Sequence, residues 1–130
     1  MADNLILYEA QEGCGRMTKY YNKLVRDYIP EIIEKQGKKA NYRVITDKEE
    51  FRTLLAEKIV EEAKELAEAL KNDDIDAVIE ELADLRTVKK AIFHHYGLEN
   101  IVEQTSTMFM IKAEEKGIFN RKIFLESVDE

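Results

Sequence analysis

The chain has 130 residues, of which 45% are hydrophobic and 36% charged, with one Pro and five Gly. This composition excludes a disordered chain and predicts one ordinary domain of long helices separated by short turns. The net charge of −7 argues against nucleic acid as a main partner, because phosphate contacts need concentrated Lys and Arg.

The beginning of the chain differs in character from the rest. We expect residues 1–16 to be an N-terminal extension and residues 17–130 to form a single helical domain. Acids stand where a signal peptide needs positive charge, and no stretch approaches the roughly eighteen uncharged apolar residues of a membrane span. The lone cysteine, Cys14, excludes an internal disulfide and fits a reducing compartment. We therefore expect a cytoplasmic protein without a membrane partner.

The first two helices are predicted between residue 28 and about residue 70. A short helix is expected near 28–36, with Pro30 in its first turn, Gly37 as its stop and Asp27 as its N-cap. The segment "KKANYRVIT" then connects elements. A long helix begins at Thr46 or Asp47, because "TDKEE" supplies a cap and acids for the first turn.

Two further helices are expected over residues 74–96 and from residue 98 or 100 to about 116, each followed by a glycine. The tail segment "KIFL", residues 122–125, is expected to form a short strand or a docked segment. The turn "KNDD" is short, so the two long helices before and after it should be antiparallel neighbours.

The expected architecture is an all-α antiparallel bundle of four to five helices. A helix of about twenty-four residues is roughly 36 Å long, which is long for a compact monomer of this size. We therefore expect oligomerisation, as a homodimer or homotetramer, to complete the bundle.

Acids recur at i,i+3 spacing in the two long helices. On a helical projection, the predicted core stripe of the first long helix consists of Phe51, Leu55, Ile59, Ala63, Leu66 and Leu70. Glu62 lies at the margin of this stripe, and Glu65 lies one step further round. In the next helix, the predicted main stripe consists of Ile75, Val78, Ile79, Leu82, Leu85 and Phe93. Glu81 and Asp84 lie inside a second apolar row of Ala77, Val88, Ala91 and Ile92. We expect these four carboxylates to converge between the helices.

Carboxylates gathered partly out of water repel one another, and desolvation adds to the cost. Either the groups protonate, or cations such as Mg²⁺ bind among them, since Mg²⁺ prefers oxygen ligands and shares them with substrate phosphates. A solvated charged face, with partners such as Lys58 and Glu62 four residues apart, is the alternative that spacing alone leaves open.

Three stretches resemble one known family. The pattern Glu61-Glu62-x-x-Glu65, fifteen residues and then Glu81-x-x-Asp84 is similar to the signature of MazG-like nucleotide pyrophosphohydrolases, the all-α NTP pyrophosphatase superfamily. The stretches "YNKLVRDYIPEII" and "KAEEKGIFNRKIFLE" resemble the two ends of its short members, which are often labelled phosphoribosyl-ATP pyrophosphohydrolase-like. The resemblance covers residues 19–126.

The resemblance implies a dimeric or tetrameric all-α enzyme that hydrolyses a nucleoside triphosphate to monophosphate and pyrophosphate with Mg²⁺, or with Mn²⁺ as an alternative ion. It implies that the metal ligands are Glu62, Glu65, Glu81 and Asp84. Glu62 or Glu65 is the expected catalytic base. Glu61 projects toward water, away from the other acids, and has no ligand role.

Basic residues are the expected substrate-binding groups, by contact with phosphate: Lys23, Arg26, Lys112, Lys116 and Arg121. Lys112 and Lys116 share one helix face, although two solvated lysines would show the same spacing. Two departures from the family pattern bear on substrate choice and metal number. Relatives often carry Arg-Gly-Gly-Phe where this chain has Lys116-Gly117-Ile118-Phe119, and many carry an acid where this chain has Thr87.

The expected role is therefore hydrolysis of nucleotides, with house-cleaning of non-canonical nucleotides as one setting. Within enzymes, the alternative is a phosphoribosyl-ATP pyrophosphohydrolase of histidine biosynthesis. The alternative of another class is a non-catalytic helical module that binds nucleotide or oligomerises, whose stability should not respond to Mg²⁺.

Overall fold

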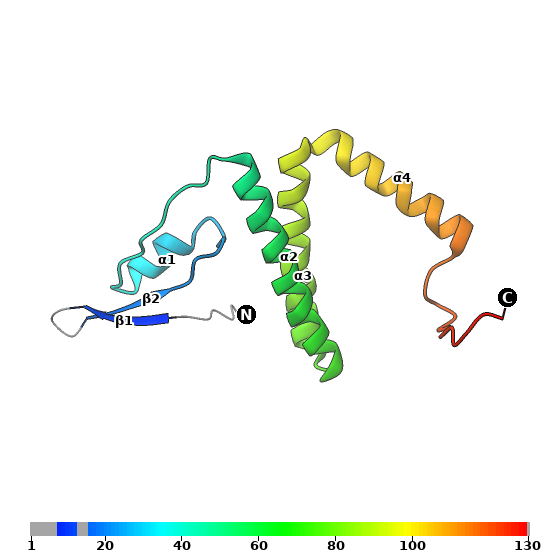
Figure 1. Ribbon diagram of the computed structural model, residues 1–130, viewed down its shortest axis with the longest axis horizontal. Helices are drawn as coiled ribbons and strands as arrows, with labels where there is room; N and C mark the ends of the chain where they lie inside the picture. Colours follow the sequence, from blue (N-terminus) through cyan, green and yellow to red (C-terminus); the bar gives the residue numbers. More distant parts are fainter. Residues whose placement is uncertain (1–7, 13–15, 130) are drawn as a thin grey trace. The chain divides into compact units, whose positions relative to one another are not determined.

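The computed structural model describes residues 8–12 and 16–129, and the chain divides into two units at the boundary between Ile92 and Phe93. The first unit contains a β-hairpin, two helices and most of a third (Figure 1). The second unit contains the last helix and the C-terminal segment. Cys14 and the greater part of the predicted N-terminal extension lie outside the described residues.

The structure contains a β-hairpin that the pattern of the sequence does not indicate. Strands β1 (Tyr8–Glu12) and β2 (Arg16–Tyr20) pair antiparallel, with Tyr8 opposite Tyr20 and Glu12 opposite Arg16. Each strand has only five residues and mixes polar with apolar types, so the alternation that announces a strand is weak.

Helix α1 (Ile29–Lys35) confirms the predicted short helix, with Pro30 in its first turn and Gly37 after its end at φ +82°. The prediction that Asp27 caps it is wrong. The N–H of Ile29 donates to the carbonyl of Arg26 at 3.1 Å, and this turn places Tyr28 at the cap position. Tyr28 makes no side-chain cap hydrogen bond.

Helices α2 (Lys48–Lys71) and α3 (Ile75–Tyr96) form a helical hairpin, as predicted (Figure 1). The side chain of Asp47 accepts from the N–H of Glu50 at 2.8 Å and so caps α2. In the turn, the N–H of Asp74 donates to the carbonyl of Ala69 at 3.1 Å, and its carboxylate accepts from the N–H of Ala77 at 3.2 Å. These bonds reverse the chain tightly and make the two helices antiparallel.

Helix α4 (Leu98–Lys116) lies between Gly97 at φ +93° and Gly117 at φ +80°. After it, the segment 122–125 has no regular structure, and Phe124 is 86% exposed. The predicted strand is therefore wrong, and docking of this segment stays a prediction. A strand must pair its backbone groups with a neighbour, and among the described residues the only sheet is the β1–β2 hairpin.

The buried face of α2 is rotated from the predicted core stripe. Its buried residues are Leu55, Glu62 and Ala69, spaced seven apart, whereas Leu70 of the predicted stripe is 60% exposed. Glu62 thus lies at the centre of the buried face and not at its margin.

Helix α3 shows the same reversal. Its buried residues, Glu81 and Val88, belong to the predicted second row. Ile75, Ile79 and Leu82 of the predicted main stripe are exposed. Apolar periodicity finds the stripe but not the surface against which it packs, and here α3 turns its mixed row towards α2.

The four helices confirm the predicted helical fold class. In the part of the chain that the structure describes, no helix has both the length and the apolar character that crossing a membrane would require.

Candidate metal and active site

Four carboxylates meet on the α2–α3 hairpin: Glu62 and Glu65 from α2, and Glu81 and Asp84 from α3. One oxygen atom of each lies within 4.8 Å of those of the others. The i,i+3 spacing puts both acids of a pair on one helix face, and antiparallel pairing turns the two faces together. The predicted convergence is confirmed, and we call these four residues the acid cluster.

Two members of the acid cluster are removed from water. Glu62 is 3% exposed and Glu81 is 6% exposed, and within the described residues the Oε2 atom of each has no hydrogen-bond partner. An unpaired buried carboxylate oxygen is costly, so it calls for a cation or a proton. The donor set consists only of carboxylate oxygens, which is what a hard divalent cation prefers. The residues present therefore fit such an ion.

Two carboxyl groups of the acid cluster, those of Glu62 and Glu65, have raised pKa values, so the cluster is not readily ionised in full. Burial, the hydrogen bond with Glu81 and the charge of Glu62 together raise the pKa of Glu65 to about 8. Burial also raises the pKa of Glu62, with Lys58 opposing and Asp84 adding to the rise. Because a bound cation favours the ionised carboxylates, its binding should release protons.

Glu61 lies beside the acid cluster and outside it. Its two Oε atoms accept from Nζ of Lys23 at 2.9 and 3.2 Å, and Oε1 also accepts from Nζ of Lys58 at 3.2 Å. Burial alone would raise the pKa of Glu61, but the two lysines together hold it below its usual value. The expectation that Glu61 points to water is wrong, because Lys23 arrives from the segment before α1. A single-helix projection cannot foresee such a contact.

Lys58 lies at the site although the sequence did not predict it as a site residue. Its Nζ lies 3.6 Å from Oε1 of Glu62, and its side chain is 15% exposed. The spacing of four residues to Glu62 is the only sequence signal for this contact, and the same spacing is typical of a solvated charged face, which was the alternative left open. The burial of Glu62 and Glu81 excludes that reading for these two acids.

Arg26 is the predicted basic residue that contacts the acid cluster directly. Its Nη2 donates to Oδ1 of Asp84 at 2.6 Å, with the side chains 55% and 19% exposed. Lys23 contacts Glu61 instead. The structure thus brings two of the five predicted substrate-binding residues to this region.

The other three, Lys112, Lys116 and Arg121, belong to the second unit and are exposed. Lys112 and Lys116 are four residues apart near the end of α4 and so share a helix face. Their contact with substrate phosphates stays a prediction.

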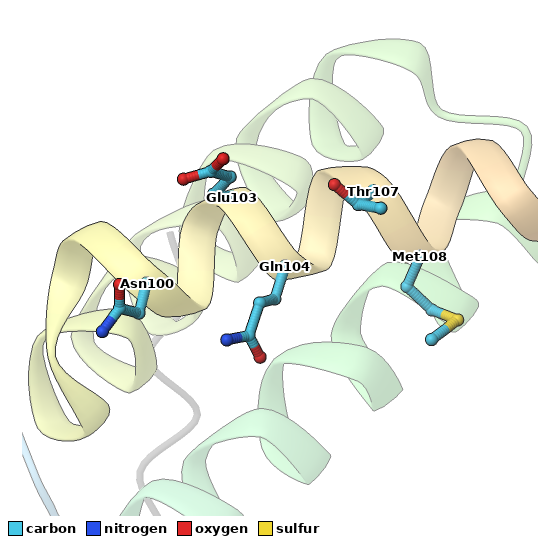
Figure 2. A pocket seen from close by; sticks show the side chains of 5 residues that line it. All are labelled: Asn100, Glu103, Gln104, Thr107 and Met108. Carbon is cyan, nitrogen blue, oxygen red and sulfur yellow. The ribbon is translucent and has the colours of Figure 1, made fainter.

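The surface of α4 carries two shallow hollows. Figure 2 shows one of about 470 Å³, lined by Asn100, Glu103, Gln104, Thr107 and Met108. The other, of about 430 Å³, is lined by Gln104, Thr105, Met108 and Phe109. No predicted site residue lines either, so these hollows are not where the predicted chemistry gathers.

Comparison with known proteins gives one match. A family model described as phosphoribosyl-ATP pyrophosphohydrolase matches residues 25–104, which is more than half of the chain and includes Arg26 and the whole acid cluster. No curated protein and no solved structure matches the chain.

Proposed function

Because the chain belongs to the phosphoribosyl-ATP pyrophosphohydrolase family, within the MazG-like all-α NTP pyrophosphatase superfamily, it is a hydrolase of phosphoric anhydride bonds, and we propose that its substrate is a nucleoside triphosphate. In this proposal, water cleaves the triphosphate to a monophosphate and pyrophosphate, with Mg²⁺ as the cofactor. House-cleaning of non-canonical nucleotides is the proposed setting.

The observation that carries this proposal is the pair of unpaired oxygens in the acid cluster, on Glu62 and Glu81. A triphosphate and four carboxylates repel each other, so a divalent cation is needed to hold them together. When bound, Mg²⁺ supplies Lewis-acid activation of a phosphoryl oxygen and lowers the pKa of water. The proposed ligands are Glu62, Glu65, Glu81 and Asp84, with Mn²⁺ as the alternative ion.

The chain's own residues supply the remaining roles. Glu65 or Glu62 is proposed to accept the proton of the attacking water, because both are carboxylates at the acid cluster. Arg26 is proposed to contact a phosphate oxygen from its place beside Asp84. Lys112, Lys116 and Arg121 are proposed to offset the charge of the departing pyrophosphate. Lys23 supports the site through Glu61 and is proposed as a weaker phosphate contact.

Phosphoribosyl-ATP is the second candidate substrate, because the matching family carries its name. It presents the same kind of triphosphate linkage, so the same acid cluster would serve. The segment "NKLVRD", residues 22–27, favours the broader nucleoside triphosphate role, since it resembles the general short members of the superfamily.

A homodimer or homotetramer is proposed as the working assembly. Large apolar side chains are exposed on both long helices, including Val60 at 51% and Leu70 at 60% on α2, with Ile75 at 65% and Ile79 at 59% on α3. Apolar surface of this extent on a helical hairpin is the kind that a second copy would cover. The proposed domain spans residues 17–130, and the proposed location is the cytoplasm.

The test is pyrophosphate release from a panel of standard, oxidised and deoxy nucleoside triphosphates and phosphoribosyl-ATP, with and without Mg²⁺. We expect Mg²⁺-dependent release by the wild type, and its loss in Glu62→Gln and Asp84→Asn. The matched control is Glu68→Gln, an exposed glutamate of the same helix outside the acid cluster, which should keep full activity.

Release that survives in Glu62→Gln would refute the assigned site. If no substrate of the panel is cleaved and the melting temperature does not respond to Mg²⁺, the non-catalytic helical module becomes the better account.

A further inference from the structure

Two basic residues of the segment before α1, Lys23 and Arg26, form ion pairs with different carboxylates. Lys23 binds both oxygens of Glu61, and its side chain is only 14% exposed. Arg26 gives a single N–H to one oxygen of Asp84, and its side chain is 55% exposed. The first contact is enclosed and the second is open to water.

The enclosed contact acts as an anchor. Glu61 accepts from both Lys23 and Lys58 and does not belong to the acid cluster, so an ion bound there leaves its partners in place. The anchor keeps residue 26 near α3. A movement of the guanidinium therefore needs only rotation about side-chain bonds, with no rearrangement of the segment.

The open contact occupies a carboxylate that a metal would use. Asp84 belongs to the acid cluster, and its Oδ1 is 2.6 Å from Nη2 of Arg26. A divalent cation held by Asp84 would place like charges close to each other, which disfavours the guanidinium at that position. The metal and Arg26 therefore compete for Asp84.

We propose that Arg26 is a resident counter-ion of the acid cluster, which pairs with Asp84 while no metal is bound and transfers to a phosphate oxygen of the substrate once Asp84 holds the metal. The guanidinium suits both partners, because its planar fork matches carboxylate and phosphate alike. The second half of this inference rests on the proposed function, whereas the first half concerns metal binding alone.

The test of the first half is Mn²⁺ binding to the nucleotide-free, full-length protein, measured by the electron paramagnetic resonance signal of free Mn²⁺. We expect Arg26→Gln to bind Mn²⁺ about two- to fivefold more tightly than the wild type, because a weak, partly exposed competitor is gone. A residue with only a structural role would weaken Mn²⁺ binding when replaced, or leave it unchanged. Either of those results would overturn the counter-ion role.

Two further variants control this measurement. Arg43→Gln removes another arginine–carboxylate pair, with Glu50 in the first turn of α2, about 18 Å along the helix axis from Glu62. Its Mn²⁺ affinity should equal that of the wild type. Arg26→Lys keeps the charge and serves if Arg26→Gln does not fold. Its Mn²⁺ affinity should differ from that of the wild type by less than about twofold, and tightening by about two- to fivefold, as expected for Arg26→Gln, would overturn competition by charge.

The test of the second half is steady-state hydrolysis of the best Mg²⁺–nucleotide found in the panel. Arg26→Gln and Arg26→Lys should both raise KM about tenfold, because neither a neutral amide nor the point charge of an ammonium offers the planar, charged fork of a guanidinium to a phosphate. An unchanged KM in both would overturn the transfer to phosphate. If the wild type cleaves nothing, the proposed function fails, and the Mn²⁺ comparison still decides whether Arg26 competes with metal.

Discussion

The α2–α3 hairpin has two faces that differ in an unusual way. The inward face buries the carboxylates of Glu62 and Glu81, which are 3% and 6% exposed. The outward side carries Ile75, Ile79 and Leu82, which are between 50% and 65% exposed. Soluble helical hairpins normally place aliphatic side chains inside and carboxylates outside.

This reversed distribution of charged and apolar side chains indicates two sources of instability in the isolated hairpin. Its inner face carries negative charge out of water, which only protons or cations can balance. Its outer face exposes apolar surface, which another surface would remove from water. Because the buried charge and the exposed apolar surface lie on different faces, a substitution can change either one and leave the other unaltered.

The largest expected effect comes from the inner face. Glu81→Gln removes one charge and one proposed metal ligand, so hydrolysis should fall by more than about a hundredfold, since even loss of groups that merely support ligands costs up to that much. Without metal and at about pH 9, its melting temperature should rise by about 3 to 6 °C, because repulsion is reduced. The measurements are pyrophosphate release and thermal denaturation.

Loss of activity together with a lower melting temperature would contradict this prediction, because it would mean that Glu81 mainly supports the fold. Glu68→Gln is the control and should change neither quantity.

The second effect tests the outer face. Ile79→Glu places a charge where a second copy is proposed to pack, and the dissociation constant of the assembly should rise at least about thirtyfold. Light scattering after size-exclusion chromatography would show the mass falling to that of a single chain. Val44→Glu is the control, because Val44 lies in the irregular segment before α2 and is 77% exposed. A wild type that is already a single chain would refute the proposed assembly.

The smallest expected effect is the pH dependence of the melting temperature of the metal-free protein. Burial, together with the neighbouring Glu81 and Glu62, raises the pKa of Glu65 to about 8, above its ordinary value of 4.5, so the folded state holds this proton more tightly than the unfolded state. The associated stability is fully present below about pH 4.5 and is lost as the pH rises towards about 8. The melting temperature should therefore fall over this window.

Glu65→Gln should show a flatter dependence on pH over the same window, because the amide does not titrate. Saturating Mg²⁺ should also oppose the fall in the wild type, since the metal favours the ionised carboxylates. Equal slopes for the wild type and Glu65→Gln would contradict the raised pKa of Glu65.

The helices and the acid cluster could be predicted because their signals are local. Asp47 begins α2, Gly97 separates α3 from α4, and Gly117 follows α4, each in the expected role. The i,i+3 spacing and the short turn after α2 were sufficient to bring four acids together. The β-hairpin could not be predicted, because short strands of mixed polarity show little periodic alternation of polar and apolar residues.

The amino-acid sequence by itself determined the helices, their order and the identity of the four converging carboxylates, because caps, turns and periodicity act over a few residues. Only the tertiary structure decided which apolar row of α3 faces α2, since either row could serve as a packing surface. It also decided that Lys23 pairs with Glu61 and that Arg26 pairs with Asp84. Those contacts join residues 38 and 58 positions apart, and no local rule specifies them.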